Sequence, residues 1–340
     1  MSWMVANMEA EFLVGFRAPL LAAVLALVVS WLLTPVARKL AIAKGAVDDP
    51  ARDARRVHKE LMPKWGGLAI YAGICVGVLL VLPLVHQPIL PYTLGILLVG
   101  GFLVVVGALD DLYEFGAKIQ APMLLAAGVA VQFFASAGSR IQIETLAIPL
   151  SGNHEYIRLI PLASILVTAA YIFVVTKTMD TIDGVDGLAA GIATISATTL
   201  CIVAFYGQQP RVAIIAAAVA GSAIGFLRHN YNPAKIFMGT GGAYILGFTL
   251  ACLSVVGAFK TAAFISLLIP VTVFGVPVVD AFVVITRRLL SHQPITQADK
   301  RHLHHQLLGK GLSPKQTMWV MCLAAIMLCS AVLFAVVKHA

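Results

Sequence analysis

Charged residues are scarce in this chain. Of its 340 residues only 12% are Asp, Glu, Lys or Arg, whereas 60% are hydrophobic and the mean hydropathy is +0.91. Soluble globular domains carry about 25% charged residues. This composition excludes an ordinary soluble domain and predicts one integral membrane domain over residues 1–340.

Paired cysteines and a leader-like N-terminus are also missing. The five cysteines form no CxxC motif and lie inside apolar runs, which excludes a zinc site and a disulfide framework; they are Cys75, Cys201, Cys252, Cys322 and Cys329. The first residues lack a basic region and a small-residue cleavage site, so we expect an uncleaved first span. The net charge of +8 comes from basic residues clustered in loops between apolar segments. We therefore expect contact with a membrane surface and no nucleic-acid partner.

Ten segments are long and apolar enough to cross a bilayer, which takes about 20 residues as a helix. The sequence thus predicts an all-α polytopic protein with about ten transmembrane helices. The predicted spans are 17–40, 66–85, 91–110, 121–138, 159–179, 187–206, 210–228, 242–259, 261–287 and 316–338. The ninth contains Pro270 and Pro277, so we expect it to be kinked or broken.

The loops differ sharply in charge. Lys and Arg concentrate after the first and ninth predicted spans, and such loops face the cytoplasm. With ten spans, the loops that follow Leu109 and Met179 share that side, and both termini are extracytoplasmic in a multi-pass protein of the inner (plasma) membrane. The outer stretch 141–158 alternates apolar and polar residues around Ser151-Gly152-Asn153, which predicts a short extracytoplasmic β-hairpin.

Carboxylates stand at the ends of apolar segments on the predicted cytoplasmic side. Asp110 and Asp111 close one segment, and Asp180, Asp183 and Asp186 close another. A carboxylate at membrane depth costs roughly 2.5–3.5 kcal/mol, so such residues usually mark a functional site. Clustered carboxylates repel one another unless a cation lies between them, which indicates a divalent metal. The alternative for Asp110-Asp111 is a solvated helix end.

Histidine, lysine and glycine join these acids in the same predicted loops. His302, His304 and His305 form one cluster, and Lys59 and Lys64 precede the Gly66-Gly67 turn. Lysine can hold diphosphate oxygens, and glycine lets backbone approach a ligand. An enzyme that handles both a charged nucleotide and a lipid would need this composition. The alternatives are surface histidines and a basic run that serves only as a topology signal.

Six stretches in order resemble a known family, the polyprenyl-phosphate N-acetylhexosamine-1-phosphate transferases, which share a superfamily with the phospho-N-acetylmuramoyl-pentapeptide translocase. The stretches are HKELMPKWGG, LDDLYEFGAK, DTIDGVDGLAAG, NYNPAKIFMG, PVVD before Arg287-Arg288, and ADKRHLHHQLL. The HLHHQLL form is similar to the N-acetylhexosamine branch. The resemblance implies transfer of a sugar-1-phosphate from a UDP-N-acetylhexosamine, most often UDP-GlcNAc, to undecaprenyl or another polyprenyl phosphate. It also implies release of UMP and a need for Mg²⁺, with Mn²⁺ as the alternative ion.

The same resemblance implies roles for individual residues. Asp110 and Asp111 would lie near the attacking phosphate, and Asp183 with His302, His304 and His305 would be the other catalytic groups. The nucleotide pocket would include Phe237, which could stack on uracil, and further substrate-binding candidates. These further candidates are Lys59, Lys64, Asp186, Asn230 and Arg301.

Two departures from the family pattern fall at the implied metal site. Thr240 stands where the family has a metal-binding Asp, and Asp180 stands where it has Asn. Our hypothesis is a compensating exchange in which the Asp180/Thr240 pair keeps the net charge. The rival interpretation is an impaired or substrate-shifted family member. Gln120, where a Lys is expected, is a smaller mismatch.

Other classes fit less well. A CDP-alcohol phosphotransferase needs an Arg at Gly191 and further acids on the next helix, which are missing. A broken-helix transporter would hold its charged site near the bilayer midplane. The choice of UDP-sugar, including UDP-MurNAc-pentapeptide, stays open. So do the glycan pathway served, the choice between one-step and covalent transfer, and whether the small residues of Ala216–Gly225 pack helices within a protomer or in a homodimer.

Overall fold

The computed structural model describes residues 2–49, 61–135, 140–147, 156–257, 274–290 and 302–339. Most of them are helical. The helices are α1 (Ser2–Lys44), α2 (Gly66–Leu84), α3 (Pro91–Tyr113), α4 (Ala117–Ala130), the 3₁₀ helix η2 (Val131–Phe133), α5 (Pro161–Ile182), α6 (Leu188–Tyr206), α7 (Pro210–Asn230), α8 (Gly239–Gly257), α10 (Gly275–Leu290), α11 (Leu303–Gly309) and α12 (Pro314–His339).

Eight of the described helices are long and apolar enough to cross a membrane, so the polytopic class predicted from the sequence is confirmed. They are α1 from Gly15 onward, α2, α3, α5, α6, α7, α8 and α12 to Lys338. The predicted span 121–138 corresponds to the shorter apolar helix Ala117–Phe133. The predicted span 261–287 falls partly outside the described residues. The count of ten therefore stays a prediction.

Local chemistry explains where several helices begin. α3, α5 and α7 begin at Pro91, Pro161 and Pro210. The ring of proline fixes φ near the helical value, and its missing N–H costs nothing in the first turn, where an N–H has no partner within the helix. Gly187 precedes α6 with φ +76°, a left-handed conformation that suits glycine. This glycine lets the chain reverse directly after the Asp180–Asp186 stretch.

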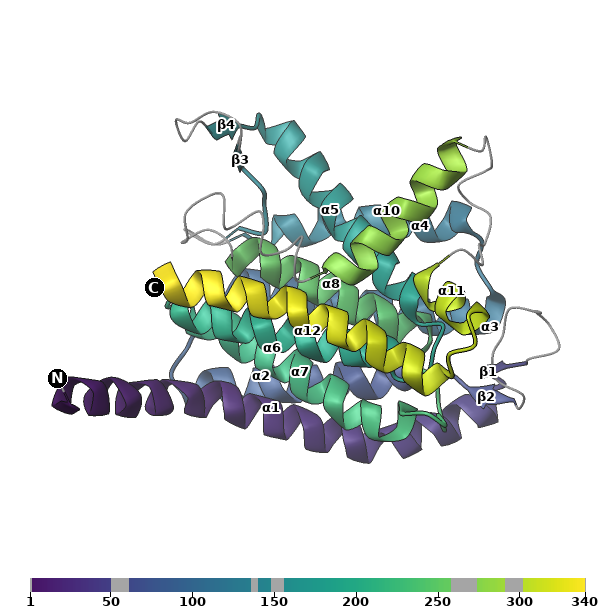
Figure 1. The fold of residues 1–340 in the computed structure, drawn as a ribbon, viewed down its shortest axis with the longest axis horizontal. Coiled ribbons are helices and arrows are strands. Elements are labelled where there is room, and N and C mark those ends of the chain that lie inside the picture. The colour runs from purple at the N-terminus through teal and green to yellow at the C-terminus, as the bar shows by residue number, and fades with distance from the viewer. Residues whose placement is uncertain are drawn as a thin grey trace.

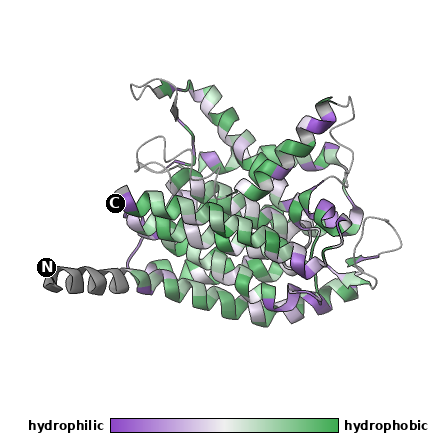
Figure 2. Ribbon diagram, viewed as in Figure 1, coloured by the Kyte–Doolittle hydropathy of each residue, from purple (hydrophilic) through white to green (hydrophobic). Residues whose placement is uncertain are grey.

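Helix α8 lies inside the helical assembly, in contact with α2, α3, α5, α6 and α7. Nearly all of its residues are buried. Helices α1 and α12 instead expose large apolar side chains such as Leu20, Trp31, Leu323 and Phe334, and the long helices are mostly apolar along their length (Figure 2). We interpret the exposed apolar faces as lipid-facing, since a bilayer accepts apolar surface that water would not.

Glycine pairs bring the start of α8 against two neighbouring helices. A β-carbon on Gly107 of α3 would lie 2.3 Å from the Cα of Gly241, and one on Gly67 of α2 would lie 2.3 Å from the backbone N of Gly242. No side chain could fit at either contact. This close approach sets the first turn of α8 directly beside the last turn of α3.

Two small ladders complete the fold. β1 (Val47–Asp48) pairs antiparallel with β2 (Met62–Pro63), which the sequence did not predict. β3 (Thr145–Ala147) pairs antiparallel with β4 (Tyr156–Arg158), in the stretch where we expected a hairpin. The residues between β3 and β4 lie outside the described ranges.

The two ends of the molecule differ in character (Figure 1). The N- and C-terminal ends both lie at the left, whereas β1, β2 and α11 lie at the right. The chain ends therefore lie far from the loops that the sequence singled out.

The glycine contact between α3 and α8 predicts a sharp sensitivity to a single methyl group. We expect Gly107→Ala to lower the melting temperature of the detergent-purified protein, because the new methyl would overlap the backbone of Gly241. Overpacking of this kind costs about 1–3 kcal/mol. The matched control is Gly309→Ala, where a β-carbon would meet nothing within 4 Å. Equal melting temperatures for the two variants would contradict the prediction.

Candidate active site

The acidic pair at the end of α3 is buried and is held by the first turn of α8. Asp110 accepts a hydrogen bond from the Thr240 hydroxyl through Oδ2 at 2.7 Å, and from Phe115 N through Oδ1 at 2.8 Å. Asp111 accepts from Thr240 N through Oδ1 at 3.2 Å. One threonine thus holds both carboxylates. This contact is possible only because the glycines let α3 and α8 approach closely.

Asp111 has one oxygen that the protein leaves unsatisfied. Its Oδ1 lies 3.8 Å from the Lys64 ammonium, which also pairs with Asp48 at 3.2 Å. Its Oδ2 is buried and has no hydrogen-bond partner within the described ranges. A buried oxygen of this kind is costly unless a ligand or ion satisfies it. This oxygen is therefore a candidate contact for a ligand or an ion.

A continuous chain of polar contacts links the acidic pair to the end of α5. Gln120 donates from Nε2 to Oδ1 of Asp110 at 3.0 Å, and its Oε1 accepts from the Lys177 ammonium at 2.7 Å. Lys177 in turn pairs with Oδ2 of Asp180 at 2.6 Å. Residues from α3, α4, α5 and α8 therefore form one network.

The turn after α5 brings two further acids into this region. The pKa of Asp183 lies well above its ordinary value. The main cause is burial, which disfavours the charged form, and the second is repulsion between the Asp183 carboxylate and those of Asp180, Asp111 and Asp186. The positive charge of Lys64 partly opposes the shift. These residues are therefore close enough to interact. Asp186 accepts hydrogen bonds from Asn232 Nδ2 at 2.9 Å and from Ala234 N at 3.0 Å.

Asn230 ties the same turn to the loop before α8. Its Oδ1 accepts from Gly187 N and its Nδ2 donates to Ile236 O, both at 3.0 Å, and the side chain is buried. Both ends of the amide are therefore engaged with backbone. This observation adds a structural role to a residue that the sequence assigned to the nucleotide pocket.

The rings of the three histidines lie close together beside the turn that contains Asp183 and Gly184. The rings of His302 and His304 lie 5.9 Å apart with 9° between their planes, and those of His304 and His305 lie 4.3 Å apart. Asp280 of α10 accepts from Leu303 N at 2.7 Å and contacts His302 Nδ1 at 2.9 Å, which fixes the start of α11. The Nε2 atom of His304 would lie 2.8 Å from a β-carbon on Gly184.

The structure thus brings together most of the residues predicted from the sequence. Lys64, Asp110, Asp111, Thr240 and Asp180 share one network, and the Asp183 turn and the histidines adjoin it. Phe237 belongs to the same loop, where its backbone N donates to Pro63 O at 2.9 Å. Lys59 and Arg301 lie outside the described residues. The roles assigned to all of these residues stay predictions.

Three contributors were not identified as site residues from the sequence. Lys177 was hidden by its place inside an apolar span. Asp280 was noted only as part of PVVD, although an acid in an apolar run was a usable signal. Tyr244, one turn after Thr240, is fully buried, and its hydroxyl has no partner in the part of the chain that the structure describes. The Tyr244 hydroxyl interacts electrostatically with Asp180, Asp110 and Asp111.

The donor atoms fit a hard cation only in part. Carboxylate oxygens are the ligands that Mg²⁺ prefers, and the ion usually takes one or two carboxylates together with water and substrate phosphates. The unsatisfied Oδ2 of Asp111 fits such a role. Among the described residues, no three His, Cys, Asp or Glu side chains gather closely enough to hold an ion. The hydroxyl of Thr240 and Oδ2 of Asp180 are engaged with Asp110 and Lys177. Any ion would therefore rely on substrate oxygens to complete its coordination.

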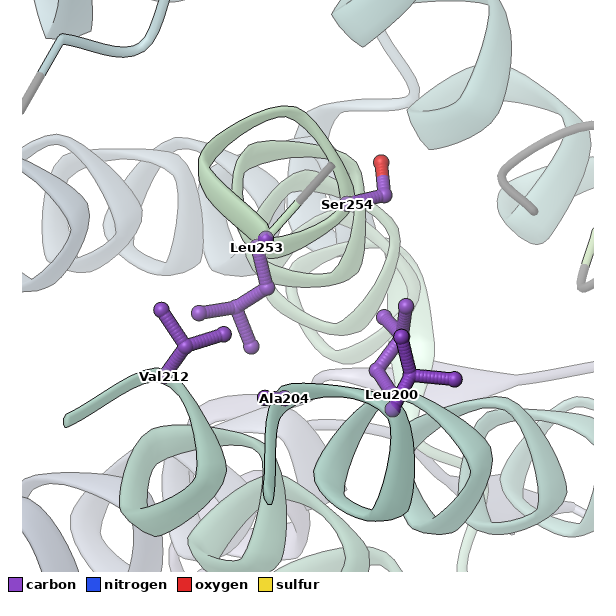
Figure 3. A pocket seen from close by; sticks show the side chains of 7 residues that line it. Leu200, Ala204, Val212, Leu253 and Ser254 are labelled. Carbon is purple, nitrogen blue, oxygen red and sulfur yellow. The ribbon is translucent and has the colours of Figure 1, made fainter. Parts of the chain in front are cut away.

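An apolar cavity lies away from this site, at the other end of α8 (Figure 3). Leu200 and Ala204 of α6, Val212 of α7, and Leu253 and Ser254 of α8 line it. Its volume is about 10 Å³, room for one water at most. We assign it no role in binding a substrate.

Comparison with known proteins agrees with the resemblance noted in the sequence. Residues 93–258 match the model of glycosyl transferase family 4. A Bacillus subtilis protein named probable undecaprenyl-phosphate N-acetylglucosaminyl 1-phosphate transferase is 34% identical over 301 residues, which cover 86% of this chain and 78% of that protein. The decaprenyl-phosphate N-acetylglucosaminephosphotransferase of Mycolicibacterium smegmatis is 32% identical, over 89% of this chain and 78% of its own length. The undecaprenyl-phosphate alpha-N-acetylglucosaminyl 1-phosphate transferase of Escherichia coli K12 is 27% identical, over 89% of this chain and 80% of its own.

The buried histidine predicts a pH dependence of stability. Burial first, and then the neighbouring His305 and His302, lower the pKa of His304 from 6.5 to about 4, with Asp280 partly opposing. Between these two values the unfolded chain binds a proton that the folded chain does not. Stability should therefore fall as pH drops from 6.5 toward 4, by at most about 1.4 kcal/mol per pH unit.

The measurement is the melting temperature of the purified protein from pH 7 to pH 4.5, compared with that of His304→Gln. The substitution should flatten the decline, because glutamine does not titrate. His86→Asn is the control, since His86 is exposed and its φ of +57° suits asparagine. An unchanged pH dependence in His304→Gln would show that another group is responsible.

Proposed function

Because this chain belongs to glycosyl transferase family 4, we propose that it transfers N-acetylglucosamine 1-phosphate from UDP-GlcNAc to a polyprenyl phosphate and releases UMP. The relatives that cover most of the chain carry names for this transfer to undecaprenyl or decaprenyl phosphate. The observation that supports it most strongly is the convergence of Asp110, Asp111, Asp180 and Lys64 from the ends of three separate elements, α3, α5 and β2. Mutual repulsion makes such a cluster costly unless positive charge stabilises it.

Both substrates are anionic, so the reaction must overcome repulsion between a lipid phosphate and a diphosphate. Phosphoryl transfer depends mainly on positioning and on neutralising that charge. Lys64 places one cation beside Asp111. In this proposal Asp110 and Asp111 lie next to the attacking lipid phosphate, and one of them orients it or holds its proton. Thr240 donates one hydrogen bond to each of the two carboxylates and so fixes their relative position.

A divalent cation, Mg²⁺ or alternatively Mn²⁺, belongs to the proposal. Asp111 would hold it through its unsatisfied oxygen, with Asp180 or Asp183 as the second carboxylate. When bound, the ion would neutralise charge on the diphosphate and on the leaving UMP. The compensating exchange between Asp180 and Thr240 stays a hypothesis, because both side chains already have protein partners.

The site would face the cytoplasm, where UDP-sugars are made, and both termini would lie on the opposite side of the inner membrane. This orientation rests on the distribution of basic loops and on the separation of the termini from the site (Figure 1). The pathway served is a cell-envelope glycan pathway, of which this would be the first membrane step. A homodimer is compatible with the exposed apolar helix faces, which contact lipid or a second copy.

The direct test uses purified protein, radiolabelled UDP-GlcNAc, undecaprenyl phosphate and Mg²⁺. We expect a lipid-extractable radiolabelled product, released UMP in equal amount, and loss of product on chelation with EDTA. A panel with UDP-GalNAc and UDP-MurNAc-pentapeptide would identify the preferred donor. Uptake of label into vesicles with no lipid product would contradict the proposal and favour a transporter.

A second test addresses the exchange at the metal site. We expect Asp180→Asn to lower the rate of transfer at least about tenfold, because no carboxylate would then stand at position 180 or 240 and one charge-assisted contact would be lost. The titration with Mg²⁺ should shift to higher concentration. Glu144→Gln is the control, since Glu144 is exposed and precedes β3. Full Mg²⁺-dependent activity in Asp180→Asn would refute the exchange.

A further inference from the structure

Lys177 is an unusual residue for its position. It lies one and a half turns before the end of α5, a helix apolar enough to cross a membrane. A lysine within such a helix is costly and usually serves a function. Its side chain is 36% exposed, so the ammonium group is neither fully buried nor free in solvent. This placement suits a cation that meets a ligand at the edge of the site.

The contacts of Lys177 orient its ammonium group and leave part of it available. Two N–H groups donate to Oε1 of Gln120 at 2.7 Å and to Oδ2 of Asp180 at 2.6 Å. A lysine ammonium has three donors. For the third, the described residues provide no hydrogen bond or ion pair. Two fixed contacts restrict the long side chain, so less freedom is lost when a ligand binds.

The acids of the site would repel an anionic ligand, so an anion can bind there only where it contacts a lysine. The described acids near the site outnumber its lysines, since Asp110, Asp111, Asp180 and Asp183 face only Lys64 and Lys177. Lys64 is already shared between Asp48 and Asp111. Lys177 is therefore the described cation at this site with the most capacity left to contact a phosphate.

We propose that Lys177 binds a phosphate group of a substrate, held in position by Gln120 and Asp180. This inference rests on the proposed transferase function and adds a binding residue to it. The phosphate can belong to the diphosphate of the sugar nucleotide or to the polyprenyl phosphate, and the two sources are separated by experiment. Toward this phosphate, Gln120 and Asp180 act as positioning residues for the ammonium group of Lys177.

The test measures the affinity of purified, detergent-solubilised protein for UDP and, separately, for a short-chain polyprenyl phosphate. We expect Lys177→Met to weaken the affinity for one of them about tenfold or more, which is the effect of losing one hydrogen bond to a charged group. The ligand that loses affinity identifies the phosphate. Lys177→Arg keeps the charge and donors and should recover most of the affinity.

Two controls separate binding from folding. Lys310→Met removes an exposed lysine that follows α11 and should leave both affinities unchanged. Lys177→Gln keeps a donor for Asp180 without a positive charge, and it replaces the methionine variant if that variant does not fold. The melting temperature of each variant shows whether the fold is intact.

Several outcomes overturn the proposal. Wild-type affinity for both ligands with a reduced kcat would mean that Lys177 only positions Asp180. A loss of both affinities together with a lower melting temperature in Lys177→Met and Lys177→Gln alike would make it a structural residue. A wild-type protein that binds neither UDP nor the lipid phosphate would reject the transferase function and the Lys177 proposal together.

Discussion

The close approach of α8 to α2 and α3 is the constraint on which the site depends. Where Gly241 meets Gly107 and Gly242 meets Gly67, no side chain separates the backbones. Thr240, next in the chain, can therefore reach both Asp110 and Asp111 with its hydroxyl and its backbone N–H. If the helices stood one methyl group further apart, the two carboxylates would lose the partner that fixes them. Packing inside the membrane and chemistry at its edge are thus set by the same contact.

Charge balance is the second determinant. The carboxylates are withdrawn from water at helix ends, where each raises the cost of ionising the others, as the raised pKa of Asp183 illustrates. The protein offsets this partly with Lys64 and Lys177, and it leaves Oδ2 of Asp111 without a partner. A site built in this way is most stable when a positively charged ligand or a substrate with its counter-ion is bound.

Much of this arrangement could be predicted from the sequence. Long apolar runs predicted the eight helices that are long and apolar enough to cross a membrane. Acids at the ends of these runs stand out because a charge is costly there. What the sequence could not predict were contacts that join distant segments. Gln120 looked like a mismatch, yet it bridges Asp110 and Lys177. Asn230 looked like a ligand candidate, yet its amide holds two loops together. Pairings between residues some 50 positions apart depend on helix packing, which periodicity does not reveal.

One continuous network of hydrogen bonds runs from Thr240 through Asp110, Gln120 and Lys177 to Asp180. This network has a consequence for evolution and for chimeric proteins. Its members alternate between groups that give and groups that receive hydrogen bonds, so replacing one leaves its neighbour with a mismatched partner. A chimera with a loop from a relative would therefore lose this network unless the residues at positions 120, 177, 180 and 240 were exchanged together. Divergence at this site should proceed by linked replacements, each set preserving the overall charge.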